Sequence, residues 1–176
     1  ICSDKTGTLT QNRMRAEAFF AEGDESPAEP WPSLFRCMAL VNDAVADATG
    51  ALAGDPTEVA LLQAAIAHGV DRAALESQLP RHGELPFDSE RKRMATVYRM
   101  AGTVRGSGRP LPEEAYLACV KGAPEAVLER CPWRLTAHGL VPFDAGEALA
   151  QAERLAARGL RVLAFAERRL DALPAD

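Results

Sequence analysis

The 176-residue sequence has few of the features that mark several large classes of protein. Only 6% of its residues are aromatic, and its 4 cysteines and 3 histidines form no CxxC pair and no spacing typical of metal ligands. We therefore expect free, buried thiols in a reducing compartment rather than a disulfide framework or a zinc site. The longest uncharged stretch, Val59 to Val70, is shorter than the roughly 20 apolar residues of a bilayer span, so the sequence predicts no membrane-spanning helix. It also predicts no signal peptide, because no basic segment at the start leads into an apolar run.

The charge balance limits the kind of partner. There are 20 basic and 25 acidic side chains, and the resulting net charge of −5 disfavours nucleic acid, because phosphate binding requires a basic field. A composition that is 47% hydrophobic excludes intrinsic disorder, and the length suits one domain with a core of its own. Because the chain opens at Ile1 rather than at a methionine, we expect it to be part of a longer protein.

The first half of the sequence predicts helices. Ser33 stands where a helix cap is expected, and apolar residues recur at helical spacing from there to Val45. A second helix is expected after Asp55, which suits the capping position before the first-turn proline Pro56. The expected apolar face of that helix consists of Val59, Leu62 and Ile66. A short third helix is expected over residues 73–79, and a short strand over residues 15–21.

From His82 onward the pattern is that of strands joined by turns. The expected strands are residues 82–87, 94–100, 115–120 and 160–167. Pro124 opens one helix, and another over residues 149–155 is followed by Gly159, which suits its end. The last strand is apolar on both faces apart from Arg161, as expected of a central strand. Hairpin-connected strands with grouped helices predict an α+β fold around an antiparallel sheet.

The clearest chemistry lies in residues 4–10, which read DKTGTLT. Asp4 follows an expected strand end and precedes a glycine turn rich in hydroxyls, which presents a carboxylate to a phosphate held by backbone amides. An aspartate is ionised at neutral pH and attacks phosphorus without a base, while the neighbouring Lys5 and Mg²⁺ would relieve the repulsion between the two anions. An ordinary Asx turn with a polar loop after it is the alternative interpretation.

Residues 1–14 read ICSDKTGTLTQNRM, which resembles the phosphorylation-site signature of P-type ATPases, the ion pumps that pass through an aspartyl-phosphate. The resemblance implies that Asp4 is phosphorylated, that Lys5 belongs to the same catalytic segment, and that Asp4 and Thr6 hold Mg²⁺ with the phosphate. Haloacid-dehalogenase-like phosphatases usually carry a second aspartate, a general acid/base, at the position of Thr6. Since Thr6 cannot serve that way, an acyl-phosphate on Asp4 is expected to persist, as a pump requires.

Three further segments resemble the nucleotide-binding domain of the same family. In the segment GDPTE, the resemblance implies that Glu58 reaches the amino group of adenine. As an alternative, Glu58 fits the third helical position of a capping box, which contributes roughly 0.5–2 kcal/mol. In the segment PFDSERKRM, Phe87 looks like the adenine-stacking aromatic, a contact that contributes on the order of 1–3 kcal/mol. A phenylalanine of the core is the alternative for Phe87.

The remaining residues carried over from the resemblance are mostly cationic. Lys92 and Met94 fall on positions that line the same pocket in the family. In the third segment, KGAPE, Gly122 would let a ligand approach the backbone, and Lys121 would be a point charge near the nucleotide. Considered alone, a lysine at a strand end is usually a solvated cap. Arg161 matches a family arginine that contacts the ribose or phosphate side of the nucleotide.

The resemblance implies an α+β nucleotide-binding domain over residues 15–170, with a twisted antiparallel sheet flanked by helices. Residues 1–14 would be a stub of the phosphorylation domain, and residues 171–176 the start of the return hinge. The implied ligands are ATP or ADP with Mg²⁺. The implied partners are the remaining phosphorylation, actuator and transmembrane domains of one parent chain. We expect a monomeric fragment at the cytosolic face of a membrane, with no nucleic-acid partner.

The implied function of the parent is ATP hydrolysis coupled to cation transport by a type II pump, with calcium as the expected ion. The fragment is expected to bind nucleotide without turning it over. Pumping of magnesium, sodium/potassium or protons is an alternative, as is a haloacid-dehalogenase-like phosphotransferase, which would need an acid in place of Thr6. A non-catalytic interaction module would leave four separate motif matches as accidents.

Overall fold

The computed structural model describes residues 14–21, 28–100 and 115–173, so Asp4, Lys5 and Thr6 lie outside the described residues. The central element is an antiparallel sheet of four strands, in the order β3 (Arg81–Asp88), β4 (Arg93–Met100), β5 (Ala115–Gly122) and β8 (Ala164–Leu170). The turn between β3 and β4 joins neighbouring strands, as the hairpin pattern predicts. The expected α+β fold around an antiparallel sheet is confirmed.

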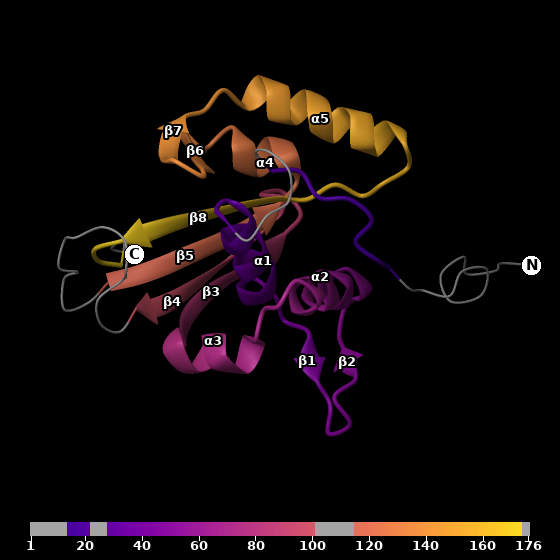
Figure 1. Ribbon diagram of the computed structural model, residues 1–176, viewed down its shortest axis with the longest axis vertical. Helices are drawn as coiled ribbons and strands as arrows, with labels where there is room; N and C mark the ends of the chain where they lie inside the picture. Colours follow the sequence, from indigo (N-terminus) through magenta and orange to yellow (C-terminus); the bar gives the residue numbers. More distant parts are fainter. Residues whose placement is uncertain (1–13, 22–27, 101–114, 174–176) are drawn as a thin grey trace, which may run out of the picture.

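Helices lie on both sides of this sheet (Figure 1). On one side are α1 (Trp31–Leu40), α2 (Pro56–Ala67) and α3 (Arg72–Gln78), with a small hairpin of β1 (Val45–Ala46) and β2 (Leu52–Ala53). On the other are α4 (Pro124–Leu128) and α5 (Ala145–Ala157), with a second hairpin of β6 (Trp133–Thr136) and β7 (Gly139–Pro142). The sequence patterns predicted neither hairpin. Among the described residues, no helix has the length and apolar character to cross a membrane.

Two clusters of buried side chains connect the helices to the sheet. The first joins α1 to α2 and includes Phe35, Met38 and Leu62. The second joins α1 to β4 and β5 and includes Val41 and Leu117. Because α1 contributes to both clusters, it sets the position of α2 relative to the strands.

The expectation that Ser33 caps the first helix is wrong. The helix α1 begins at Trp31, and Ser33 is buried within its first turn. The carboxylate of Glu29 accepts a hydrogen bond from the main-chain N–H of Ser33 at 3.1 Å, so it satisfies one of the free donors at this helix start. The helix also ends at Leu40, and Val45 lies in β1 instead.

The start of α2 is as expected, but its buried face is not. The Asp55 carboxylate accepts a hydrogen bond from the main-chain N–H of Thr57 at 2.8 Å, and the helix begins directly after it. Leu62 is buried as expected and Leu61 is buried as well, whereas Ile66 is 47% exposed. Since α2 carries apolar residues nearly all round, its periodicity could not determine which face meets the core.

The first and the last of the expected strands differ from expectation. Residues 15–21 form no strand. The strand expected at the centre of the sheet, residues 160–167, is β8, which begins at Ala164 and lies at the edge of the described sheet. Contacts with helices, rather than a central position in the sheet, explain why this segment is apolar. Leu163 and Phe165 pack against the first buried cluster, between α1 and α2, and α4 lies against the same strand.

Two buried thiols predict a pH dependence of stability. Cys37 of α1 and Cys119 of β5 are free and buried, and the neighbouring Cys119 together with burial raises the pKa of Cys37 well above its usual value. Above about pH 8.5 the unfolded chain releases a proton that the folded chain retains, so the free energy of unfolding should fall as pH rises further. Urea unfolding from about pH 7 to 10 measures this slope. Cys37→Ala should make it shallower, and equal slopes would contradict the assignment.

Candidate functional site

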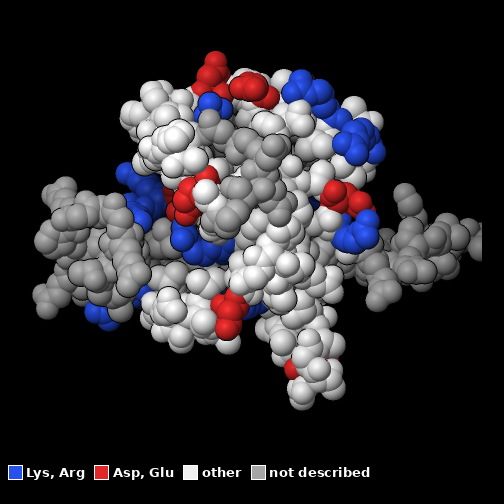
Figure 2. All heavy atoms as spheres, in the orientation of Figure 1, with Lys and Arg blue, Asp and Glu red and all other residues white. Residues whose placement is uncertain are grey.

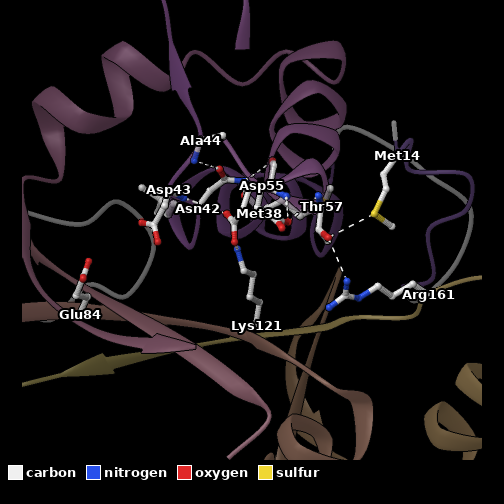
Figure 3. Close-up of polar contacts among 12 residues, drawn as sticks. Met14, Met38, Asn42, Asp43, Ala44, Asp55, Thr57, Glu84, Lys121 and Arg161 are labelled. Atoms are coloured by element: carbon white, nitrogen blue, oxygen red, sulfur yellow. Dashed lines mark hydrogen bonds and ion pairs between the residues drawn. The ribbon is translucent and has the colours of Figure 1, made fainter. Parts of the chain in front are cut away.

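An ion pair lies where the start of α2 faces the sheet. Lys121 extends from β5 toward the first turn of α2 (Figure 3). Its ammonium donates to Oε1 of Glu58, and the side chains of the lysine and the glutamate are only 9% and 15% exposed. Two residues that were assigned separately to nucleotide binding are therefore in direct contact.

The second carboxylate oxygen of Glu58 is bound by the backbone of another segment. Its Oε2 accepts a hydrogen bond from the main-chain N–H of Asp43 at 3.0 Å. Asp55 caps the helix through the N–H groups of Thr57 and Glu58, at 2.8 and 3.4 Å. The capping-box alternative for Glu58 is therefore wrong: Asp55 caps α2, but the carboxylate of Glu58 binds Asp43 and Lys121 instead of the N–H of Asp55.

Burial governs the electrostatics of this pair. Burial lowers the pKa of Lys121, and the hydrogen bond and charge of Glu58 act in the opposite direction. Burial also raises the pKa of Asp55, but hydrogen bonds from Thr57 and Glu58, with the charge of Arg161, outweigh it and leave that pKa lowered. An anionic ligand that reached Lys121 would therefore compete with Glu58 for the ammonium.

Packing within the protein explains why position 122 is a glycine. A Cβ on Gly122 would clash with the carbonyl oxygen of Lys92 and would lie 2.6 Å from Cβ of Arg93. The same carbonyl of Lys92 accepts a hydrogen bond from the main-chain N–H of Ala123 at 2.9 Å. Lys92 and Arg93, where the β3–β4 turn leads into β4, therefore pack directly against Gly122 at the end of β5. That a ligand approaches Gly122 stays a prediction.

Lys92 is an exposed cation of this region. It occupies the left-handed backbone region, with φ of 52°, and its ammonium lies 3.1 Å from Oε1 of Glu125. Both side chains of this pair are more than half exposed. Lys92 is thus more accessible than Lys121 to a ligand that arrives from solvent.

The two apolar candidates differ in exposure. Phe87, near the end of β3, is 60% exposed, so its alternative assignment to the core is wrong. Met94 is 3% exposed and packs with Cys37 and Leu117, opposite Lys121 in the register of β4 and β5. The ring of Phe87 is therefore accessible from solvent, whereas Met94 is part of the core and supports β4 next to Lys121.

Arg161 lies on the other side of the start of α2 (Figure 3). It is exposed, it precedes β8, and its Nη1 donates to Oγ1 of Thr57 at 3.3 Å. A cavity of about 440 Å³ opens beside Arg161 and Thr57, and its lining includes residues 14–20 and side chains of α1, α2, α4 and α5. The first turn of α2 therefore has Lys121 near one side and Arg161 near the other.

Charge is mixed on the face drawn in Figure 2, where basic and acidic side chains of the described residues lie next to one another. Affinity for an anion would accordingly come from individually placed cations. The candidates are Lys92, Lys121 and Arg161.

Two site residues carried no distinctive sequence signal. Asn42 and Asp43 lie in the loop after α1, and Asn42 is fully buried. The available signal was a pair of adjacent polar residues after an apolar run, which is also typical of an ordinary turn. Only the folded chain shows that they contact Glu58.

Comparisons with known proteins identify the family to which this fold belongs. Residues 30–175 match the family described as P-type ATPase, cytoplasmic domain N. The chain is 36% identical over 203 residues to the cation-transporting ATPase pma1 of Synechocystis sp., covering 97% of the chain and 21% of that protein. It is 36% identical over 177 residues to calcium-transporting ATPase 1 of Bacillus cereus, covering 94% of the chain and 18% of that protein.

A third relative is the probable cation-transporting ATPase F of Mycobacterium bovis, which is 34% identical over 192 residues, covering 93% of the chain and 20% of that protein. The chain belongs to the P-type ATPase family and corresponds to its cytoplasmic domain N. The resemblance found in the sequence is thereby confirmed. The chain spans about a fifth of the length of these relatives.

Proposed function

We propose that the chain is the ATP-binding domain of a P-type ATPase that couples ATP hydrolysis to cation transport. The observation that carries the proposal is the buried ammonium of Lys121 at the same end of the sheet as the exposed ring of Phe87. In the sheet, Asp88 pairs with Arg93, and Arg93 pairs with Gly122. The end of β3 and the end of β5 therefore lie at the same end of the sheet, with only β4 between them. A cation and an accessible aromatic face suit a phosphorylated purine.

Each residue has a place in this proposal. Phe87 stacks on the adenine ring, Glu58 accepts from its amino group, and Lys121 supplies positive charge beside the nucleotide. Lys92 lines the pocket at its surface, the buried Met94 supports it from the strand that pairs with Lys121, and Gly122 is where the ligand approaches the backbone. Arg161 contacts the ribose or phosphate side. The cluster supports these roles because Glu58 and Lys121 share one ion pair and Arg161 lies on the other side of the same helix turn.

Phosphoryl transfer is assigned to a different segment. Asp4 is the proposed nucleophile, with Lys5 beside it, and Asp4 and Thr6 would hold Mg²⁺ through a carboxylate and a hydroxyl, oxygen ligands that this ion prefers. When bound, Mg²⁺ would neutralise charge on the transferred phosphate. The chain alone would bind ATP without turning it over, because the remaining phosphorylation, actuator and transmembrane domains complete the parent at the cytosolic face of a membrane.

Calcium is the proposed ion. The relatives in Bacillus cereus and Lactococcus lactis are named calcium-transporting, whereas others carry only the word cation. Uptake of radioactive calcium by vesicles that contain the longer protein tests this assignment. Uptake of another cation without calcium would contradict it.

Phe87→Ala is expected to weaken ATP binding by about 5- to 150-fold, the equivalent of a stacking contact of about 1–3 kcal/mol. Since Phe87 is 60% exposed, the free energy of unfolding should change by less than about 0.5 kcal/mol. Calorimetric titration of the chain with ATP measures the affinity. Leu85→Ala is the matched control, because Leu85 is 56% exposed on the same strand, and it should leave the affinity unchanged.

No binding of ATP at millimolar concentration by the unaltered chain would contradict the nucleotide site. An equal loss of affinity in the Phe87 and Leu85 variants would contradict the stacking role.

A further inference from the structure

Asn42 is a fully buried polar side chain in the loop between α1 and β1. Its Nδ2 donates to the main-chain carbonyls of Met38 and Glu58, at 3.3 and 2.9 Å. Its Oδ1 accepts from the main-chain N–H of Ala44 at 2.9 Å. One side-chain amide therefore joins the last turn of α1, the following loop and the first turn of α2.

The same loop holds Glu58 at two points. Asn42 binds the main-chain carbonyl of Glu58, and the N–H of the next residue, Asp43, binds its carboxylate at 3.0 Å. Lys121 holds the other carboxylate oxygen. A carboxylate accepts about four hydrogen bonds, so this arrangement leaves it acceptor capacity for a ligand.

Two arginines that do not contact Glu58 also hold this loop in place. Arg72 donates to the carbonyl of Ala44 and, at 3.3 Å, to that of Asn42. The Asp43 carboxylate pairs with Arg81 at 2.8 Å. These contacts fix the loop to α3 and β3, and the amide of Asn42 transmits that position to α2.

We propose that Asn42 is a positioning residue that sets the selectivity of the site for adenine over a purine without the amino group. The inference rests on the proposed function, in which Glu58 accepts from that amino group. Asn42 contacts no ligand itself and acts through the place it imposes on Glu58. When the contacts that support a site are removed, its side chains become less well positioned. A hydrogen bond to a charged acceptor such as the Glu58 carboxylate depends strongly on the position of that acceptor.

Calorimetric titration with ATP and with ITP, whose base has a carbonyl in place of the amino group, tests the inference. The unaltered chain should prefer ATP by about tenfold or more. Asn42→Ala should bring this preference below about threefold, mainly through loss of ATP affinity. Glu58→Gln should have the same effect, and the two substitutions together should cause no further loss.

Tyr98→Phe is the matched control. It removes another buried hydrogen bond from a side chain to the main chain, from the Tyr98 hydroxyl to the carbonyl of Leu40, at the same end of α1. A merely structural role for Asn42 predicts that both variants lose stability and both keep the ATP preference. We expect only the Asn42 variant to lose the preference.

Two further measurements keep the inference testable if Asn42→Ala does not fold. Asn42→Ser keeps an acceptor for Ala44 but is too short to reach both carbonyls, so it should also lose the preference. In the unaltered chain, NMR should show slow solvent exchange of the Asn42 side-chain amide, and rapid exchange would overturn the inference.

The outcomes separate this inference from the proposed function. A preference for ATP that depends on Glu58 but survives in folded Asn42 variants would overturn the role of Asn42 alone. Failure of the unaltered chain to bind either nucleotide would overturn the proposed function, and the inference with it.

Discussion

Lys121→Met is expected to weaken ATP binding at least about tenfold and to lower the free energy of unfolding by about 3 kcal/mol. The lysine side chain is 9% exposed and is bound to a carboxylate that is 15% exposed, so its removal leaves Glu58 charged, nearly buried and without its counter-ion. A buried charge without a partner costs several kcal/mol, which exceeds the benefit of the pair itself. Urea unfolding measures the stability, and calorimetric titration measures the affinity.

Lys92→Met provides the matched control for this substitution. Lys92 also pairs with a glutamate, Glu125, at 3.1 Å, but the two side chains are 57% and 51% exposed. Exposed pairs contribute little, so stability should change by less than about 1 kcal/mol. Equal losses of stability in the two lysine variants would contradict the distinction between a buried and an exposed pair.

A double substitution separates stability from binding. Glu58→Gln combined with Lys121→Met leaves no unpaired charge, so we expect it to recover most of the stability that Lys121→Met loses. It should not recover ATP affinity, because the positive charge beside the nucleotide remains absent. Recovery of both would show that Lys121 serves only to neutralise Glu58.

Asp4→Asn is expected to abolish the acid-stable phosphoenzyme in the longer protein that carries this chain. An asparagine amide has no ionised oxygen to attack phosphorus, and Thr6 offers no other carboxylate two positions on. ATP binding should persist, because the proposed nucleotide contacts belong to residues 58–161. Labelling with radioactive ATP, followed by acid quenching, measures the phosphoenzyme.

Asp47→Asn is the control for the loss of a single carboxylate. Asp47 accepts a hydrogen bond from the main-chain N–H of Thr49 at 2.8 Å in the β1–β2 hairpin. Its substitution should leave labelling unchanged. Labelling that survives Asp4→Asn would remove Asp4 as the nucleophile.

Elements that depend on local chemistry were predicted well. Asp55 and Pro56 determine the start of α2, because a capping carboxylate and a fixed proline φ act over one turn. The end of β3 and the start of β4 likewise follow from a charged turn between apolar runs. Ser33 was assigned wrongly as a cap because Glu29, from outside the helix, binds its N–H instead.

Elements that depend on their neighbours were not predictable in this way. The buried face of α2 depends on α1, since α2 has almost no polar stripe to define it. The position of β8 at the edge of the described sheet depends on pairing with β5, whereas its apolar residues reflect contacts with helices. Both depend on packing between segments that are distant in the sequence.

The sequence by itself determined the family and most of the candidate site residues, because contiguous motifs carry that information within a few positions. Only the tertiary structure decided that Glu58 binds Lys121, that Phe87 is exposed, and that Asn42 supports Glu58. The physical reason is the packing of α1, which buries side chains against both α2 and the sheet. That packing brings the two charges together, and no local pattern in either segment specifies the other.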